Sequence, residues 1–108
     1  MAMRRMVLER AGHTVTEARD LRAVSEACRN ISVSVAILGQ SLPQKEKLRI
    51  GDVIRSECPR TKILELHIGM SPDVLSADAN LQVVAGAVPE SLVECVAALA
   101  SSRKRQRA

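Results

Sequence analysis

The chain of 108 residues has no phenylalanine, tyrosine or tryptophan. Its core must therefore be built from aliphatic side chains. The absence also removes the aromatic platforms on which proteins stack unpaired bases, which argues against a single-strand or RNA binder. Hydrophobic residues make up 46% and charged residues 26% of the chain, as in ordinary globular proteins, and the length suits about one domain.

Histidine and cysteine are also scarce. The chain has two histidines, His13 and His67, and three cysteines, Cys28, Cys58 and Cys95. No pair of them has the close spacing of a metal site, so we expect neither a metal nor another cofactor. Each cysteine lies within or at the end of an apolar helical pattern, which predicts three small buried hydrophobic residues in a reducing cytoplasm.

Long hydrophobic runs are missing as well. None approaches the roughly 18 apolar residues of a transmembrane helix, and the N-terminus lacks the apolar region of a secretory signal. We therefore expect a cytoplasmic protein without membrane contact. The net charge of +4 owes much to four cations at 103–107. The pattern predicts a single domain at 1–100 and a basic disordered tail at 101–108.

The stretch 33–43 organises the rest of the chain. Val33, Val35 and Ile37 are β-branched residues within an apolar run, which predicts a buried strand, and Gly39 and Pro43 then indicate a sharp loop. In a doubly wound α/β domain such a strand lies near the centre of the sheet, and chemistry gathers just beyond its carboxyl end. Gly39 and its neighbours are therefore the first place to look for a site.

The remaining patterns alternate between helices and strands. This alternation predicts an α/β fold with a parallel sheet and helices on both faces. The segment 71–80 is predicted to be a loop with at most a short helix. We expect helices at 1–11, 20–30, 44–58 and from 89, the third with Leu48, Ile50 or Gly51, Val53 and Ile54 inward, and strands at 13–16, 33–38, 62–67 and 81–85.

Four stretches together resemble the receiver domain of bacterial two-component response regulators. They are 3–15 (MRRMVLERAGHTV), 35–43 (VAILGQSLP), 58–66 (CPRTKILEL) and 89–92 (PESL). The resemblance covers nearly the whole chain and implies a flavodoxin-like, doubly wound parallel sheet that lacks the family's first strand.

The resemblance also locates the family's phosphorylation site. The phosphoacceptor aspartate falls on Gly39, the hydroxyl position on His67 and the lysine position on Ala85, while the acidic pair that holds Mg²⁺ would precede Met1. A hard cation and fixed positive donors are what phosphoryl transfer requires. We therefore expect a degenerate receiver that is not phosphorylated and is not an enzyme.

Three other residues are candidate substitutes for the missing phosphoacceptor. Ser41 and Asp52 read as ordinary loop and helix-surface residues, and His67 could carry a phosphoryl group as in a phosphorelay, although no partner is evident nearby in sequence. Gly39 either serves a tight turn or leaves a pocket for a small ligand.

The missing first strand leaves three alternatives open. The strand at 13–16 moves next to the strand at 33–38, or another chain supplies a strand. Alternatively, the recorded start at Met1 lies downstream of the true one. Each alternative would provide hydrogen-bond partners for backbone groups that the missing strand would otherwise leave buried and unpaired, which is energetically costly.

The leading functional hypothesis is a receiver-like signalling module that acts by protein contacts, with a signalling protein or a second copy of itself as partner. The alternatives are a truncated, non-functional receiver fragment and weak, salt-dependent nucleic-acid binding through the basic tail at 103–107. In receivers the fourth helix, fifth strand and fifth helix form the partner face, which here would span Leu81 to Leu99, with Leu81, Val83, Pro89, Leu92 and Val96 as its residues.

Overall fold

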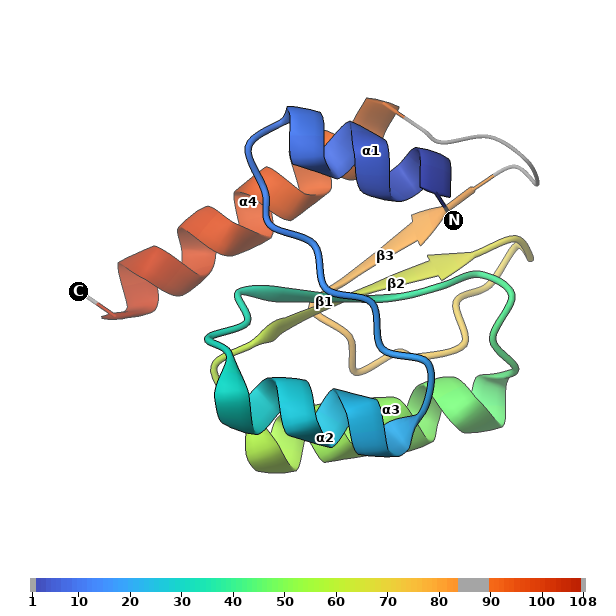
Figure 1. The fold of residues 1–108 in the computed structure, drawn as a ribbon. Coiled ribbons are helices and arrows are strands. Elements are labelled where there is room, and N and C mark those ends of the chain that lie inside the picture. The colour runs from blue at the N-terminus through green and yellow to red at the C-terminus, as the bar shows by residue number, and fades with distance from the viewer. Residues whose placement is uncertain (1, 84–89, 108) are drawn as a thin grey trace.

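The computed structural model describes the backbone of residues 2–83 and 90–107, and the side chains of 4–83 and 91–101. Within these residues the chain is an α/β protein with a parallel sheet, as the sequence predicts (Figure 1). Its elements are α1 (Ala2–Arg10), α2 (Leu21–Asn30), β1 (Val35–Leu38), α3 (Gln44–Glu57), β2 (Lys62–His67), β3 (Ala79–Gln82) and α4 (Glu90–Arg107).

The described sheet has the order β1-β2-β3, with all pairs parallel. Ile37 lies opposite Leu64, and Leu66 opposite Leu81. The expectation that 33–38 forms a central strand is not met, because β2 occupies the middle of these three strands. Five of the six residues of β2 are buried, whereas β1 is mostly half-buried.

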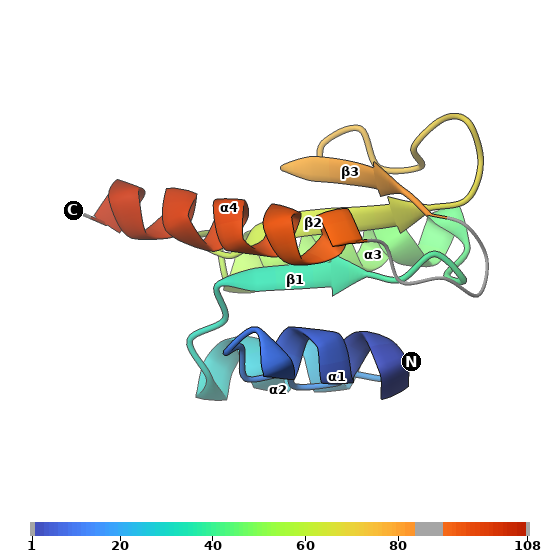
Figure 2. The same ribbon diagram turned by 90° about the horizontal axis from the view of Figure 1, so that it is seen from above.

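Helices cover both faces of the sheet. Figures 1 and 2 show α1 and α4 on one face and α2 and α3 on the other. The sheet divides the core in the same way. One apolar cluster joins Leu8 of α1 and Leu92 of α4 to Leu64 of β2, and a second joins Ile54 of α3 to Ile63. The alternation of side chains along β2 supplies both clusters.

The predicted strand at 13–16 is absent, since these residues belong to no strand in the described structure. The segment between α1 and α2 instead crosses the outer side of β1, from one helix layer to the other (Figure 1). Val15 packs against the first core cluster. A chain running across the strand direction cannot form a ladder with β1, so the alternating pattern produces one anchoring side chain rather than a strand.

Two helix ends have clear local causes. Gly12 follows α1 with a φ of 97°, a left-handed conformation that glycine adopts readily. Asp20 begins α2, where its carboxylate accepts a hydrogen bond of 2.8 Å from the amide of Ala23.

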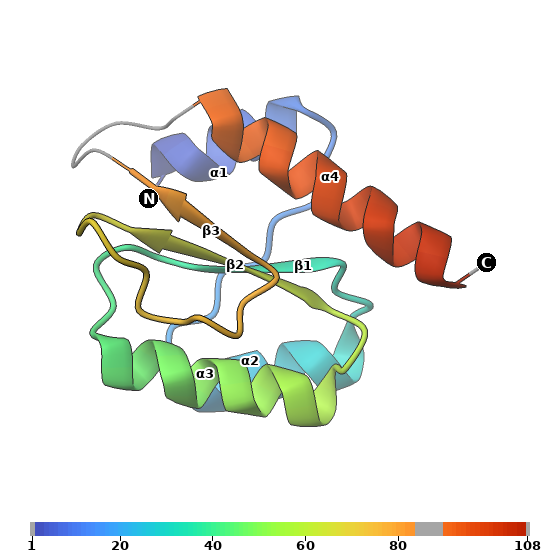
Figure 3. The ribbon, with the colours of Figure 1, turned by 180° about the vertical axis from the view of Figure 1, so that it is seen from behind.

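The C-terminal third departs from the predicted boundaries. β3 begins at Ala79, two residues before the predicted strand, and residues 68–78 form an irregular connection that descends toward α3 (Figure 3). Helix α4 extends to Arg107, over residues for which the sequence predicts a disordered tail. Ala85 and Pro89 lie outside the described residues.

Two of the three cysteines are not free, contrary to expectation. Cys28 and Cys58 form a disulfide with a Cα–Cα distance of 5.5 Å, while Cys95 is a free, half-buried thiol. The two partners are 30 residues apart in sequence. They meet because α2 and α3 pack side by side and their last turns lie together, a proximity that the separate helical patterns do not reveal.

Candidate functional site

Two of the three positions that the receiver resemblance singles out, Gly39 and His67, lie where the parallel strands end. Gly39 follows β1 and His67 ends β2, and carboxyl ends of parallel strands share an edge. Gly39 is buried in a turn, where its carbonyl accepts a hydrogen bond from the amide of Leu42. Beside it, the guanidinium of Arg4 donates to Oε1 of Gln40 at 3.0 Å. This edge offers no carboxylate at position 39.

His67 is buried, with 7% of its surface exposed. Its Nδ1 lies 2.7 Å from the carbonyl oxygen of Gly69, and because a carbonyl oxygen only accepts, Nδ1 is the donor of this hydrogen bond. The contact orders the turn that follows β2. Ser41 and Asp52, the other residues considered as phosphoryl acceptors, are both exposed.

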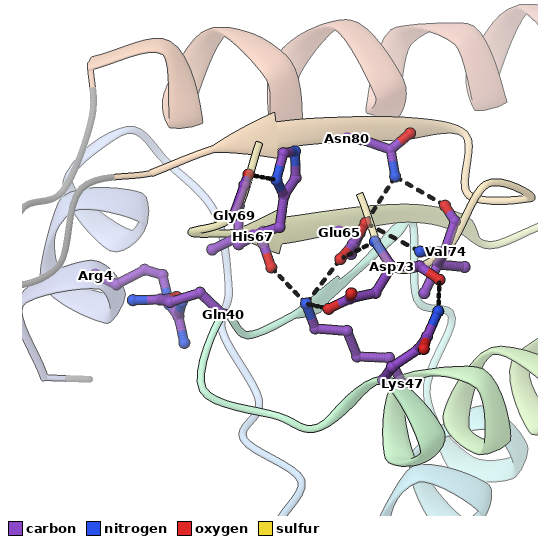
Figure 4. A network of polar contacts seen from close by, with 11 residues as sticks. Arg4, Gln40, Lys47, Glu65, His67, Gly69, Asp73, Val74 and Asn80 are labelled. Atoms are coloured by element: carbon purple, nitrogen blue, oxygen red, sulfur yellow. Dashed lines mark hydrogen bonds and ion pairs between the residues drawn. The ribbon is translucent and has the colours of Figure 1, made fainter. Parts of the chain in front are cut away.

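A buried lysine forms the centre of the polar contacts near this edge. Lys47 of α3 is 1% exposed, and its ammonium donates to Oε2 of Glu65 at 2.7 Å, to the carbonyl of Leu66 at 2.9 Å and to Oδ2 of Asp73 at 3.1 Å (Figure 4). An ammonium has three N–H groups. All three are therefore satisfied within the protein.

Glu65, in the middle of β2, is completely buried and equally well satisfied. Besides Lys47, its carboxylate accepts hydrogen bonds from the amides of Asp73 and Val74 and from the side chain of Asn80 at 2.8 Å. Asn80 also donates to the carbonyl of Val74. We refer to Lys47, Glu65, Asp73 and Asn80 as the buried network, after its two buried members Lys47 and Glu65; Asp73 is half-buried and Asn80 is exposed.

The network stabilises the charged form of both buried groups. Burial by itself would lower the pKa of Lys47, but the hydrogen bonds and the attraction of Glu65 and Asp73 outweigh it and raise that pKa above its ordinary value. Burial would likewise raise the pKa of Glu65. The hydrogen bonds from Lys47, Asn80 and two backbone amides instead lower it.

This arrangement is suited to holding structure rather than to catalysis. A lysine acts as a nucleophile when its amine is deprotonated and accessible, and Lys47 is neither. Glu65 is similarly enclosed. What the network does is tie the connection 68–78 to α3 and β2. No group of three metal-ligating side chains occurs among the described residues.

The network is not evident from the sequence, because charged residues are expected to face solvent. Lys47 lies four residues before Gly51 and seven before Ile54, both buried, so it shares their helix face. Leu48, which was expected to point inward, is 44% exposed. Glu65 likewise interrupts an apolar strand. The available signal was a charged residue inside each of two apolar patterns, a lysine in the helix and a glutamate in the strand.

The predicted partner face lies mainly in the core. Val83, Leu92 and Val96 are buried, and Leu81 packs half-buried against them; Pro89 is outside the described residues. These side chains hold α4 to the sheet and cannot at the same time form an exposed patch. The apolar side chains that solvent does reach in the β2–β3 connection are Ile68 (51% exposed), Met70 (90%) and Leu75 (84%).

The chain matches no family model, no curated protein and no solved structure. Among the helices in the described ranges, none combines the length and the apolar character needed to cross a membrane. The side chains at 103–107, on which the nucleic-acid alternative rests, lie outside those described, so that alternative stays a prediction.

Proposed function

We propose that the chain is a degenerate, receiver-like interaction module with a flavodoxin-like fold, which acts in bacterial two-component or phosphorelay signalling by binding a protein and without accepting a phosphoryl group. The cytoplasmic location expected from the sequence is part of this proposal. The partner is a signalling protein or a second copy of the chain.

The first support is the chemistry of the carboxyl edge. Position 39 is a buried glycine, and the nearby imidazole of His67 is hydrogen-bonded to a backbone carbonyl. The buried ammonium of Lys47 is already neutralised by Glu65 and Asp73. An aspartyl phosphate needs an acceptor carboxylate and available positive charge, and these residues supply neither.

The observation that carries the proposal is the apolar connection between β2 and β3. Ile68, Met70 and Leu75 expose most or half of their surface, which is unusual for large apolar side chains gathered in one short segment. The buried network holds the same segment through the amides of Asp73 and Val74. A loop held in place loses less conformational entropy on binding, so it is well suited to protein contact.

The absence of phosphorylation is tested by incubating the chain with acetyl phosphate and Mg²⁺ and measuring its intact mass. We expect the mass to stay unchanged, with a typical receiver domain in the same tube as the positive control. An adduct of one phosphoryl group on this chain would overturn the degenerate-receiver proposal.

The contact surface is tested by replacing Met70 and Leu75 together with glutamate. Because both side chains are largely exposed, the double variant should fold normally and should lose the partner that the unaltered chain retains on an affinity matrix. Self-association, measured by sedimentation velocity, should be lost if the partner is a second copy.

Ile31→Glu is the matched control. Ile31 is 47% exposed but belongs to the connection between α2 and β1, not to the β2–β3 connection. Equal partner retention by the double variant and the control would exclude the connection as the binding surface.

A further inference from the structure

The disulfide joins the last turns of the two helices that cover one face of the sheet. Cys28 lies in the final turn of α2, and Cys58 is the residue at which α3 ends. Cys95 of α4 packs against the core cluster on the other face, so the sheet separates it from this pair. The pair is therefore isolated from the third thiol.

The disulfide is accessible through a pocket. A cavity of about 230 Å³, open to solvent, is lined by both cysteines. Ser32, Arg60 and Thr61 contribute polar groups to the same lining, and Arg60 is exposed. Both cysteines are half-buried rather than enclosed, and an exposed guanidinium in the same lining favours a thiol that carries carboxylates.

Apart from the disulfide, helix α2 is held by half-buried apolar side chains such as Val24, which packs against the second core cluster, and by exposed polar contacts. None of its residues is fully buried. Its polar contacts with α3 are exposed: the hydroxyl of Ser25 donates to the Glu57 carboxylate at 2.7 Å, and Arg29 lies 3.9 Å from the same group. Exposed ion pairs contribute little to stability. The segment before α2 forms no strand, so α2 can move without breaking a ladder.

We propose that Cys28–Cys58 is a thiol–disulfide exchange site for small anionic thiols of the glutathione type, and that its reduction releases α2 from α3. The inference stands independently of the proposed function.

The exchange consumes two thiol molecules. The first attacks one sulfur as the thiolate, the S–S bond breaks, and a mixed disulfide and a free cysteine thiolate result. The second thiolate attacks the mixed disulfide and leaves both cysteines as thiols after protonation. The two small thiols depart joined as their own disulfide, so the protein gains the two electrons that they lose.

The site is tested by equilibrating the full chain in buffers of defined reduced-to-oxidised glutathione ratio, followed by alkylation and mass spectrometry. The chain is unfolded in the alkylating solution so that every free thiol reacts. As the proportion of reduced glutathione rises, we expect Cys28 and Cys58 to change together from unmodified to alkylated. Cys95 should be alkylated at every ratio. Alkylation of all three cysteines even in oxidised glutathione would overturn the proposal.

The release of α2 is tested by hydrogen exchange on the reduced and oxidised chain. We expect exchange in 21–30 to become at least tenfold faster on reduction, with 62–67 unchanged. Cys95→Ser should respond like the unaltered chain, and Cys28→Ser combined with Cys58→Ser should show the fast exchange under all conditions. Equal protection of 21–30 in both redox states of the unaltered chain would overturn the release of α2.

The role of the pocket is tested with Arg60→Glu. We expect reduction by glutathione to slow several-fold relative to the unaltered chain, and reduction by the neutral thiol β-mercaptoethanol to keep its rate. If both thiols keep their rates, Arg60 does not select anionic thiols and that part of the proposal fails.

Discussion

At the scale of single residues, substitution of Lys47 or Glu65 should lower the free energy of unfolding the most. Each is a charged group in the core, and each satisfies the other. A buried ion pair contributes little net stability compared with apolar residues, but removing one partner leaves an uncompensated charge. The consequence of a substitution therefore depends on whether one or both are changed.

Lys47→Met should lower the free energy of unfolding by about 3–5 kcal/mol, because Glu65 is then buried without its cation. Urea denaturation followed by circular dichroism measures the change. Arg49→Met is the control, since Arg49 is 56% exposed on the same helix, and it should change the value by less than about 0.5 kcal/mol. Equal effects of the two substitutions would show that Lys47 is not a buried partner.

Lys47→Met combined with Glu65→Leu should be more stable than Lys47→Met alone, because the double change removes the buried charge together with its partner. The same urea titration measures it. If the double variant is no more stable than the single one, the loss in Lys47→Met comes from packing rather than from the unpaired carboxylate.

The two pKa shifts predict that the folded chain loses stability at low pH because of Glu65 and at high pH because of Lys47. The pKa of Glu65 is lowered in the folded chain, so its stabilising contribution is complete above the ordinary value of about 4.3 and is lost as the pH falls below it. The pKa of Lys47 is raised, so its contribution is complete below about 10.4 and is lost as the pH rises through the higher folded value.

Unfolding free energies measured between about pH 3 and pH 11 should therefore fall at both ends, with a plateau between the ordinary pKa values of these groups. The double variant Lys47→Met with Glu65→Leu is the reference. Its unfolding free energy should fall less at both ends of the pH range. An identical pH profile for the two proteins would contradict these assignments.

At the scale of elements, local patterns predicted the helices well where a cap or a break accompanied them. Asp20 and Gly12 mark helix ends through backbone contacts within a few residues, which is information that a short stretch of sequence carries. The pattern at 13–16 is equally clear but forms no strand. A strand needs a neighbour to pair with, and the segment crosses the sheet edge instead of following it.

Asp20→Ala should lower the free energy of unfolding by about 1 kcal/mol, since the amide of Ala23 loses its acceptor at the start of α2. Thermal or urea denaturation checks this. Arg22→Ala, at a side chain that is 89% exposed in the same turn, should cost a few tenths of that amount. A larger loss for Arg22→Ala would mean that charge, not capping, governs this helix end.

At the scale of the whole molecule, the disulfide closes a loop of 30 residues that includes β1 and α3. Its reduction should lower the free energy of unfolding by about 3–4 kcal/mol, chiefly because the open unfolded chain gains conformational freedom. Urea denaturation with and without a reductant measures the change. In Cys95→Ser the same difference should persist, and an unchanged midpoint in the unaltered chain would contradict the prediction.

The sequence by itself determined the α/β class, the parallel sheet, most helix and strand bounds and the glycine at position 39. These follow from hydrophobic period, turn residues and caps, which act over a few residues along the chain. The tertiary structure decided that β2 rather than β1 lies in the middle of the described sheet, that Lys47 meets Glu65, and that Cys28 meets Cys58. Such contacts join residues 18 and 30 positions apart. They depend on how helices pack against a sheet and against each other, and no local pattern contains that geometry.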